Sequence, residues 1–259
     1  TVRGADDEIR RALSNFGFEW DGGIVVQSQR YDRYNSVLHE LVSAGEVYPC
    51  SCTRKQIVAS AKMGVDGLVY PGFCRNGLQK GAAARAWRLK VPELEFGFVD
   101  QIQGLVRQQL ARDVGDFVLL RADGCWAYQL AVVVDDADFG VTHVVRGVDL
   151  LDSTPRQLYL QRCISAGEVQ YAHIPVVVNE LGEKLSKQTK APILVRGEES
   201  AQLWQCLRLL WQQPPMSLQG APLAELWSWA FATWDLSQIP PKRSVSVTLE
   251  QKNEYKILL

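Results

Sequence analysis

Apolar and polar residues follow two different spacings along this chain. Over residues 5–16 and 31–44, apolar side chains recur every three or four positions, and a glycine, Gly17 or Gly45, follows each segment. This spacing predicts two amphipathic helices that end at those glycines. Compact apolar runs bounded by polar or turn-forming residues predict short strands. These runs are residues 86–91, 117–120 and 141–145.

The segment Tyr128–Asp138 fits both spacings. Its centre, Val132–Val134, is typical of a strand, because β-branched side chains pack well on a pleated surface. However, four apolar side chains share one helical face, and Gly140 follows the segment. The four are Leu130, Val133, Val134 and Ala137. We therefore predict a helix here.

A further helix is predicted to begin at Thr154 and to run to about residue 165. Thr154 stands three positions before Gln157, and Pro155 occupies the first helical position, so these residues fit a capping box. Residues 174–178 form an all-apolar run. Such a run predicts a strand that is buried on both faces of its sheet.

Beyond residue 197 the pattern becomes helical and rich in tryptophan. Strands that alternate with helices, followed by helices alone, indicate an α/β protein with a small helical C-terminal region. The 259 residues are 47% hydrophobic and 22% charged, which suffices for a packed core and excludes a disordered, fibrous or coiled-coil protein. No apolar run approaches the roughly 20 residues that span a bilayer, so we expect no membrane association.

The composition gives little information about binding partners, but it indicates a cellular compartment. The formal net charge is −1, and a balanced charge neither supports nor excludes binding to a nucleic acid. Six cysteines are too sparse for a domain stapled by disulfides, which points to a reducing compartment. We therefore expect a cytoplasmic protein.

Three of these cysteines, Cys50, Cys52 and Cys74, flank a loop rich in glycine and proline. Thiolates are good zinc ligands, and zinc prefers four donors in a tetrahedron. The nearest histidine, His39, lies within a predicted helix, whereas Tyr70 stands four residues before Cys74 and could supply a phenolate oxygen. The alternative is three free thiols beside a tyrosine that only packs. The sequence leaves both interpretations open.

Two lysines flank a serine in the segment Lys184-Leu185-Ser186-Lys187, which follows the predicted strand at 174–178. Loops at the carboxyl ends of strands in open α/β sheets are common ligand sites. Ammonium groups there can hold the phosphates of ATP and neutralise a pyrophosphate leaving group. A solvated basic turn is the alternative.

Arg146 stands at the end of the predicted strand at 141–145. A planar guanidinium at such a position can bind a substrate carboxylate in bidentate fashion, and Tyr128 can add a hydroxyl to the same pocket. The alternatives are a structural ion pair of Arg146 with Asp149 or Asp152, and a tyrosine that only packs. The pattern alone does not decide between them.

Seven stretches in one order resemble a known family, the glutamyl-queuosine tRNA(Asp) synthetases, which are shortened relatives of the class I glutamyl-tRNA synthetases. The resemblance covers nearly the whole chain. It rests on Gln27–Arg30, Tyr48–Cys52, Tyr70–Cys74, Tyr128–Asp136, Thr142–Gly147, Leu150–Gln157 and Lys184–Gln188. It implies a Rossmann-like class I aminoacyl-tRNA synthetase catalytic domain with a zinc-containing insertion and a small helical C-terminal region.

The resemblance also implies how the chain is divided. We expect the remainder of the first half of the nucleotide-binding domain in residues 1–49 and the zinc-containing insertion in residues 50–112. The second half of the catalytic domain, with the Lys184–Gln188 motif, is expected in residues 113–196. The helical C-terminal region is expected in residues 197–259.

Roles for individual residues follow from the same resemblance. Cys50, Cys52, Tyr70 and Cys74 match the family's structural zinc site, which holds one ion. Tyr128 and Arg146 match its glutamate-binding residues. Lys184, Ser186 and Lys187 match its ATP-binding motif, in which Lys187 takes the place of the catalytic lysine.

The implied reaction has two steps. The α-carboxylate of L-glutamate attacks the α-phosphate of ATP, normally with Mg²⁺, and gives glutamyl-adenylate and pyrophosphate. A hydroxyl of the queuosine base at the wobble position of tRNA(Asp) then attacks the activated carbonyl. Positioning and charge stabilisation supply most of the catalysis. We expect the enzyme to be a monomer.

The chain departs from the family pattern at its beginning. The 259 residues lack the first class I motif, a histidine- and glycine-containing loop that should precede Thr1, and the early acidic residue that helps to bind the glutamate amino group. We therefore expect these residues alone to be inactive or badly impaired, although the complete gene product is an enzyme.

Two alternative functions remain. The first is a catalytic fragment of an ordinary glutamyl-tRNA synthetase that charges the tRNA 3′ end. Against it, only 72 residues follow Lys187, too few for the large anticodon-binding region of those enzymes. The second is a non-catalytic, zinc-stabilised nucleic-acid-binding module, which has no need of a phosphate-binding lysine and a carboxylate-binding arginine.

Overall fold

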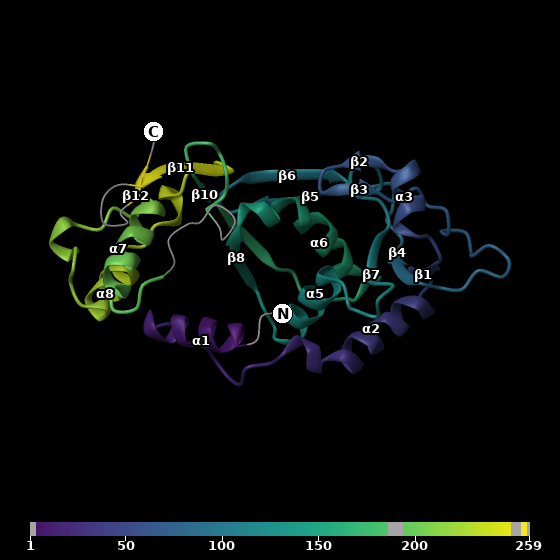
Figure 1. Cartoon of the computed structure of the whole chain (residues 1–259), viewed down its shortest axis with the longest axis horizontal. Helices are drawn as coiled ribbons and strands as arrows, with labels where there is room; N and C mark the ends of the chain where they lie inside the picture. The colour runs from purple at the N-terminus through teal and green to yellow at the C-terminus, as the bar shows by residue number, and fades with distance from the viewer. Residues whose placement is uncertain (1–3, 186–193, 250–254, 258–259) are drawn as a thin grey trace. The chain divides into compact units, whose positions relative to one another are not determined.

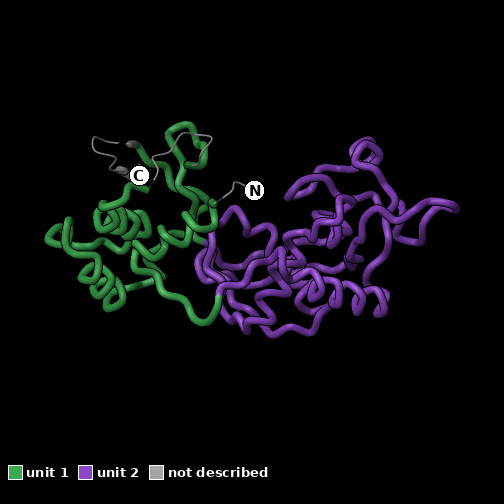
Figure 2. Tube along the Cα trace, turned by 60° about the horizontal axis from the view of Figure 1, so that its bottom comes forward, with its two compact units in different colours: residues 1–23, 174–259 green, residues 24–173 purple. Residues whose placement is uncertain are grey.

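Two hydrophobic cores, built from different parts of the chain, define two units. The structure, a computed structural model, describes residues 4–185, 194–249 and 255–257 (Figure 1). One unit contains residues 24–173, and the other contains residues 1–23 and 174–259 (Figure 2). Among the helices of the described ranges, none is long and apolar enough to cross a membrane.

The unit of residues 24–173 contains most of the predicted strands. Its helices are α2 (Tyr31–Ser43), α3 (Arg54–Ser60), α4 (Leu110–Asp113), α5 (Tyr128–Asp138) and α6 (Thr154–Cys163), with the 3-10 turns η1 (Gln27–Gln29) and η2 (Val148–Ser153). Its strands are β1 (Val47–Cys50), β2 (Lys62–Gly64), β3 (Gly67–Val69), β4 (Ala86–Leu89), β5 (Glu95–Asp100), β6 (Gly104–Gln109), β7 (Phe117–Leu120), β8 (His143–Gly147) and β9 (Gln170–Ile174). Strand β4 pairs with β1 and β7 in an antiparallel sheet, whereas β2–β3 and β5–β6 form hairpins. Strand β8 lies beside β9.

The core of this unit forms where α5 packs against α2, α6 and β7. Its side chains Leu130, Val133 and Val134 are buried on one face, so the predicted helix at Tyr128–Asp138 is confirmed. The same cluster includes Tyr34, Val37, Leu38 and Leu41 of α2, Leu119 of β7 and Leu160 of α6. Removal of these apolar side chains from water is the main force that holds the unit together.

The other unit is mainly helical, as predicted for the C-terminal region. It contains α1 (Ala5–Asn15), β10 (Val176–Val178), α7 (Glu199–Leu209), η3 (Met216–Leu218), α8 (Leu223–Thr233), η4 (Leu236–Gln238), β11 (Ser244–Leu249) and β12 (Tyr255–Ile257). Helices α7 and α8 pack around Trp204 and Leu226. After α1, Gly17 turns the chain with a left-handed φ of 78°, and the Trp227 indole N–H donates to the Phe16 carbonyl at 2.7 Å. The left-handed φ favours glycine at this turn.

The run at residues 174–178 forms parts of two strands. Pro175 separates β9 from β10, because proline has no N–H to donate within a ladder. Strand β9 lies beside β8, whereas β10 pairs in parallel with β11, with Val176 opposite Ser244. The prediction of one continuous strand is therefore wrong. The division of the chain into four functional regions remains a prediction.

Loss of a buried side chain from the core of residues 24–173 should destabilise the fold far more than loss of an exposed one. Leu119 in β7 is fully buried, whereas Leu105 in β6 is 60% exposed. We expect Leu119→Ala to lower the free energy of unfolding by about 2 to 5 kcal/mol, through lost apolar contact and the cavity left behind. Leu105→Ala should change it by less than about 0.5 kcal/mol. Urea unfolding followed by tryptophan fluorescence measures both, and equal losses would contradict this core.

Candidate functional site

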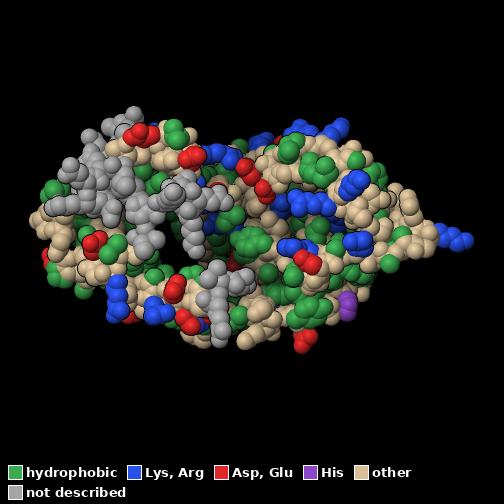
Figure 3. Space-filling view, viewed as in Figure 1, with side chains coloured by type: hydrophobic (Ala, Val, Ile, Leu, Met, Phe, Trp, Pro, Cys, Tyr) green, Lys and Arg blue, Asp and Glu red, His purple; other side chains and the backbone are tan. Residues whose placement is uncertain are grey.

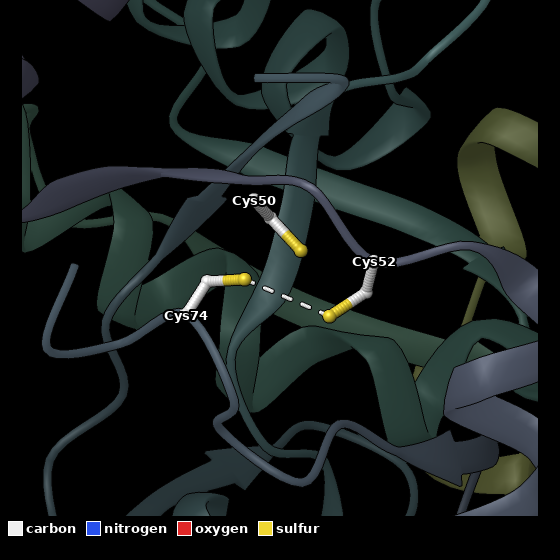
Figure 4. A group of neighbouring side chains, drawn as sticks. All are labelled: Cys50, Cys52 and Cys74. Atoms are coloured by element: carbon white, nitrogen blue, oxygen red, sulfur yellow. Dashed lines mark hydrogen bonds between the residues drawn. The ribbon is translucent and has the colours of Figure 1, made fainter. Parts of the chain in front are cut away.

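Strand β1 and the segments that follow it bring three cysteine sulfurs together. Cys50 ends β1, Cys52 lies just before α3, and Cys74 lies between β3 and β4. The three Sγ atoms all lie within 4.8 Å of one another, and those of Cys52 and Cys74 are 3.6 Å apart (Figure 4). The cysteines that the sequence singled out therefore form one cluster.

The Tyr70 hydroxyl is a fourth donor atom beside this cluster. Its Oη lies 3.4 Å from the Sγ of Cys50 and 3.3 Å from that of Cys52, and it accepts a hydrogen bond from the backbone N–H of Cys74 at 3.0 Å. Ligand atoms about 2.0 to 2.3 Å from a tetrahedral zinc ion lie about 3.5 to 3.8 Å from one another. The observed separations are close to these values, so the four side chains fit a zinc ion.

Burial and hydrogen bonding act in opposite directions on the thiols. Burial raises the pKa of Cys52 to about 11. Burial also acts to raise the pKa of Cys74, but hydrogen bonds from the Tyr70 hydroxyl and from Ser51 outweigh it and lower this pKa to about 6. The Arg88 guanidinium lies 3.9 Å from the centre of the Tyr70 ring. A metal cation between these donors would favour their deprotonated forms, because it stabilises negative charge.

Local sequence explains why the chain closes around the cysteines. Helix α3 begins with a capping box, in which the Thr53 hydroxyl accepts from the Gln56 N–H and the Gln56 amide accepts from the Thr53 N–H. Gly115, with a φ of 70°, lies against the chain just before the tyrosine of the cluster. A Cβ at this position would come within 2.8 Å of the Val69 side chain, so glycine allows this close approach.

Arg146 lies at the end of β8 and is half-buried. Its Nε–H donates to His173 Nε2 at 3.1 Å, and its Nη2 donates to Thr154 Oγ1 at 2.9 Å and to Gln157 Oε1 at 2.6 Å. All three acceptors are uncharged groups. Within the described part of the chain, Arg146 forms no ion pair and its Nη1 has no hydrogen-bond partner. The structure therefore does not show the alternative, an ion pair with a nearby aspartate.

The predicted capping box at the start of α6 is wrong. The helix begins at Thr154 with Ser153 as its N-cap, and no side chain caps it. The Thr154 hydroxyl instead donates to the Leu150 carbonyl and accepts from Arg146, and the Gln157 amide oxygen also accepts from Arg146. Charge-assisted hydrogen bonds from a guanidinium are stronger than those from a neutral backbone N–H. The two side chains at capping-box spacing therefore bind the arginine.

His173 in β9 and Asp100 at the end of β5 have fully buried side chains that contact each other. The Nδ1 atom of His173 lies 2.6 Å from Oδ2 of Asp100, whose Oδ1 accepts from the backbone N–H groups of Ile102, Gln103 and His173. Burial lowers the pKa of His173, and the opposing effect of Asp100 is smaller. Burial acts to raise the pKa of Asp100, but its hydrogen bonds outweigh this effect and lower the pKa. The pair is therefore an ionised aspartate and a neutral histidine.

A second chain of hydrogen bonds leads away from Gln157. Its amide N–H donates to Gln129 at 2.8 Å, Gln129 donates to Ser153, and the Ser153 hydroxyl donates to Asp66. Asp66, in the turn of the β2–β3 hairpin, also accepts from Arg156 at 2.8 Å. These contacts connect the surroundings of the half-buried arginine with the segment that carries the cysteines and tyrosine.

Two further predicted site residues, Tyr128 and Lys184, lie at exposed positions. Tyr128 is the first residue of α5 and is 49% exposed. Lys184 is exposed in a hairpin after β10, where it forms a β-bridge with Val178. Ser186 and Lys187 lie outside the described residues. The assignments of these residues to glutamate and ATP stay predictions.

The sequence patterns did not single out His173 or Asp100. His173 is one of only three histidines and stands in the largely apolar run Tyr171–Ile174. A polar side chain in such a run needs a buried partner, which was the available signal. Asp100 carried no comparable signal, because its partner lies 73 positions away in the chain.

Comparisons with known proteins identify the fold. Residues 1–210 match the family described as tRNA synthetases class I (E and Q), catalytic domain. The crystal structure of a glutamate–tRNA synthetase from Elizabethkingia anophelis superposes with a TM-score of 0.74 over 95% of this chain and 58% of that one. A glutamate–tRNA ligase from Elizabethkingia meningosepticum gives 0.73 over 93% and 57%. Both are 20% identical in sequence, so the likeness concerns the fold, and this chain spans somewhat more than half of their length.

Relatives named glutamyl-Q tRNA(Asp) synthetase are much more similar in sequence. The protein from Chromobacterium violaceum is 54% identical over 92% of this chain and 80% of its own length. The protein from Dechloromonas aromatica is 52% identical over the same shares. The chain belongs to the class I tRNA synthetases for glutamate and glutamine and, within them, to the glutamyl-Q tRNA(Asp) synthetase family. The predicted family and fold class are confirmed.

Removal of one cysteine from the cluster should abolish metal binding. We expect the protein purified with zinc to hold about one ion per chain, and Cys74→Ser to hold almost none, because structural zinc sites need all four ligands. Cys125→Ser is the matched control, since Cys125 is an exposed free cysteine outside the cluster. Elemental analysis measures the metal content, and thermal unfolding with and without a chelator measures its contribution to stability. Equal zinc in both variants would contradict the assignment.

The buried neutral histidine should make stability depend on pH. The pKa of His173 is lowered from 6.5, so below about pH 6.5 the unfolded chain binds a proton that the folded chain does not. The free energy of unfolding should therefore fall as the pH is lowered from 7 towards 5. Asp100, Arg146 and Asp149 are the charged groups that act on this imidazole.

His173→Gln should flatten this dependence by up to about 1.4 kcal/mol per pH unit, the limit for one proton. His39→Gln, on the exposed face of α2, is the control and should leave the slope nearly unchanged. Urea unfolding at a series of pH values measures the slopes. An identical slope for wild type and His173→Gln would show that His173 is not a buried neutral group.

Proposed function

We propose that the protein that contains these 259 residues catalyses the ATP-dependent activation of L-glutamate and its transfer to the queuosine base of tRNA(Asp). It belongs to a family of tRNA synthetases, which are ligases, and similar relatives carry the name glutamyl-Q tRNA(Asp) synthetase. The observation that carries the proposal is the set of hydrogen bonds made by the half-buried Arg146 guanidinium. Its three hydrogen-bond acceptors are uncharged, so no carboxylate contacts the guanidinium directly and the group can bind an anionic ligand.

The guanidinium suits the side-chain carboxylate of glutamate. In the activation step an oxygen of the α-carboxylate attacks phosphorus, so this group must remain free to react. Arg146 therefore holds the γ-carboxylate, which distinguishes glutamate from neutral glutamine. Because Nε and Nη2 already bind the protein, the ligand contacts Nη1, and the Tyr128 hydroxyl supplies a second donor. This contact takes the place of the bidentate one expected from the sequence.

The segment Lys184–Lys187 binds the phosphates of ATP in this proposal. A bond forms between an oxygen of the α-carboxylate and the α-phosphorus, and the bond from that phosphorus to the bridging oxygen of the β-phosphate breaks. The leaving pyrophosphate carries the developing negative charge. Lysine ammonium groups stabilise this charge as mobile point charges, with Lys187 as the catalytic lysine and Lys184 and Ser186 as further phosphate contacts. Mg²⁺, when bound with ATP, adds charge neutralisation.

Transfer of glutamate to the tRNA also depends on how the enzyme positions the reactants. The oxygen of a queuosine hydroxyl attacks the carbonyl carbon of glutamyl-adenylate, an ester bond forms, and the bond to the phosphate oxygen of AMP breaks. The hydroxyl proton passes to solvent. The enzyme holds the two reactants together and needs no covalent intermediate of its own.

A structural zinc ion completes the proposed site. Cys50, Cys52, Tyr70 and Cys74 would hold it, and when bound it would cross-link the end of β1 to the loop between β3 and β4. This insertion also reaches the surroundings of Arg146 through Asp66 and its hydrogen bonds. The ion therefore supports the geometry of the site without taking part in the reaction.

The tRNA partner requires a surface that attracts phosphate. Figure 3 shows Lys and Arg side chains spread over the part of residues 24–173 around β2, β3 and β6. Lys62 in β2 and Arg107 in β6 are exposed members of these strands. Such side chains supply the sequence-independent electrostatic part of nucleic-acid binding, although the net charge of the chain is −1.

Labelling experiments on the full-length gene product test the proposal. Radiolabelled glutamate and ATP are offered with tRNA that contains or lacks queuosine. We expect labelling that depends on queuosine and survives removal of the 3′ adenosine, because the ester lies on the wobble base. Labelling lost with that adenosine would make the protein an ordinary glutamyl-tRNA synthetase. No labelling at all would favour a non-catalytic nucleic-acid-binding module.

Arg146→Gln should specifically weaken glutamate binding. Loss of a charged partner costs about 2 kcal/mol or more, so the KM for glutamate should rise at least about 30-fold while the KM for ATP changes little. Arg121→Gln is the control, because Arg121 is an exposed arginine of the same unit that pairs with Asp123 and has no role in the proposed site. Glutamate-dependent ATP–pyrophosphate exchange on the full-length protein measures both constants. An unchanged KM for glutamate would remove Arg146 from the proposed site.

A further inference from the structure

A buried aspartate–histidine pair, Asp100 and His173, contacts the half-buried Arg146 through the histidine ring. Asp100 Oδ2 lies 2.6 Å from His173 Nδ1, and His173 Nε2 lies 3.1 Å from Arg146 Nε. The three side chains come from β5, β9 and β8. Asp100 and His173 have no exposed side-chain surface, so neither can contact a substrate.

We propose that Asp100 and His173 are positioning residues for Arg146. Asp100 holds the Nδ1 proton of His173, so that Nε2 remains an acceptor for the Nε–H of Arg146. This inference rests on the proposed function, in which Arg146 binds the γ-carboxylate of glutamate. It assigns the orientation of the guanidinium to two residues that never touch the substrate.

The donor and acceptor rules of the three groups determine the arrangement. A carboxylate can only accept, so the proton between Asp100 and His173 sits on Nδ1. A neutral imidazole then has its lone pair at Nε2, where the guanidinium N–H requires an acceptor. If Nε2 carried a proton, two N–H groups would face each other across 3.1 Å and the guanidinium would turn away.

The Tyr171 ring restrains the same two groups from one side. It stacks on the His173 ring with 5.9 Å between ring centres and an interplanar angle of 14°. The Arg146 guanidinium lies 5.3 Å from the centre of the Tyr171 ring. The imidazole therefore has little freedom to rotate, and the line from Asp100 to the guanidinium is held by packing as well as by hydrogen bonds.

A neutral acceptor orients the arginine without cancelling its charge. A carboxylate in direct contact with Arg146 would form an ion pair and compete with an anionic substrate. Asp100 is instead separated from the guanidinium by the imidazole, and three backbone N–H groups and the imidazole N–H satisfy its charge. The arrangement therefore combines fixed geometry with a positive charge that no carboxylate contacts directly.

Three variants of the full-length protein distinguish a specific role in orienting Arg146 from a general role in maintaining the fold. His173→Asn keeps an N–H near Nδ1 for Asp100 but has no atom near Nε2. His173→Gln places an amide near Nε2, and its oxygen can accept from the arginine. Asp100→Asn keeps an acceptor for the backbone N–H groups but turns an NH₂ towards Nδ1, which favours the tautomer with the proton on Nε2. His39→Gln, exposed on α2, is the matched control.

We expect the KM for glutamate to rise about 10- to 100-fold in His173→Asn and Asp100→Asn, by analogy with the losses seen when residues that orient metal-binding side chains are removed. The KM for ATP should change by less than about 3-fold. His173→Gln should restore most of the glutamate affinity, and His39→Gln should behave as wild type. Parallel losses for both substrates, with no recovery in His173→Gln, would show a merely structural role and overturn the inference.

A double-variant cycle distinguishes this inference from the proposed function. In an Arg146→Gln background, His173→Asn should cause no further rise in the KM for glutamate, because the group it orients is gone. If Arg146→Gln alone leaves the KM unchanged, the proposed glutamate site fails. If Arg146→Gln raises the KM but neither His173→Asn nor Asp100→Asn does, only the positioning inference fails.

Nuclear magnetic resonance tests the tautomer without any activity measurement. The chain has three histidines, so the ring of His173 is assigned in long-range ¹H–¹⁵N spectra by comparison with His173→Gln. We expect a proton on Nδ1 alone in the wild-type protein and on Nε2 in Asp100→Asn. A wild-type His173 protonated at Nε2 would overturn the inference even if every variant folded poorly.

Discussion

A half-buried positive charge, that of Arg146, whose hydrogen-bond acceptors are all neutral, is the constraint on which much of the unit of residues 24–173 depends. Water solvates a guanidinium well, so its partial burial is tolerated only where the protein supplies acceptors. For Arg146 these acceptors come from β9 and from the first turn of α6. The side-by-side position of β8 and β9 and the start of α6 at Thr154 are therefore requirements of the site as well as features of the fold.

The hydrogen bonds around this charge extend well beyond the arginine. Through Gln157, Gln129 and Ser153 they reach Asp66, which lies in the hairpin between the second cysteine of the cluster and the tyrosine. Asp66 also pairs with the largely buried Arg156. A shift of the β2–β3 hairpin would remove Asp66 as acceptor from both Ser153 and Arg156, which are buried. The β2–β3 hairpin and the surroundings of Arg146 are in this way parts of one polar network.

Sequence patterns predicted the longer helices but not the short helices α3 and α4, and they singled out the cysteines that cluster, because these signals depend on residues close together in the chain. The periodicity of Leu130, Val133 and Val134 identified α5, and the clustering of cysteines identified a candidate metal site. Partners far apart in sequence could not be predicted, as for Asp100 and His173. The capping box at Thr154 failed for a related reason: local spacing carries no information about a guanidinium that arrives from another strand.

The cysteine–tyrosine cluster and the surroundings of Arg146 each suit a ligand of opposite charge. Three thiols and a phenol surround a space that suits a cation, and a cation bound there would favour the deprotonated forms of all four groups. Arg146 is a cation whose protein contacts are all neutral, and it suits an anion. In both places the fold holds the donor atoms in position but leaves the opposite charge to be supplied by a ligand. In the proposed function, neutral acceptors hold Arg146 in place, and its charge attracts the side-chain carboxylate that distinguishes glutamate from glutamine.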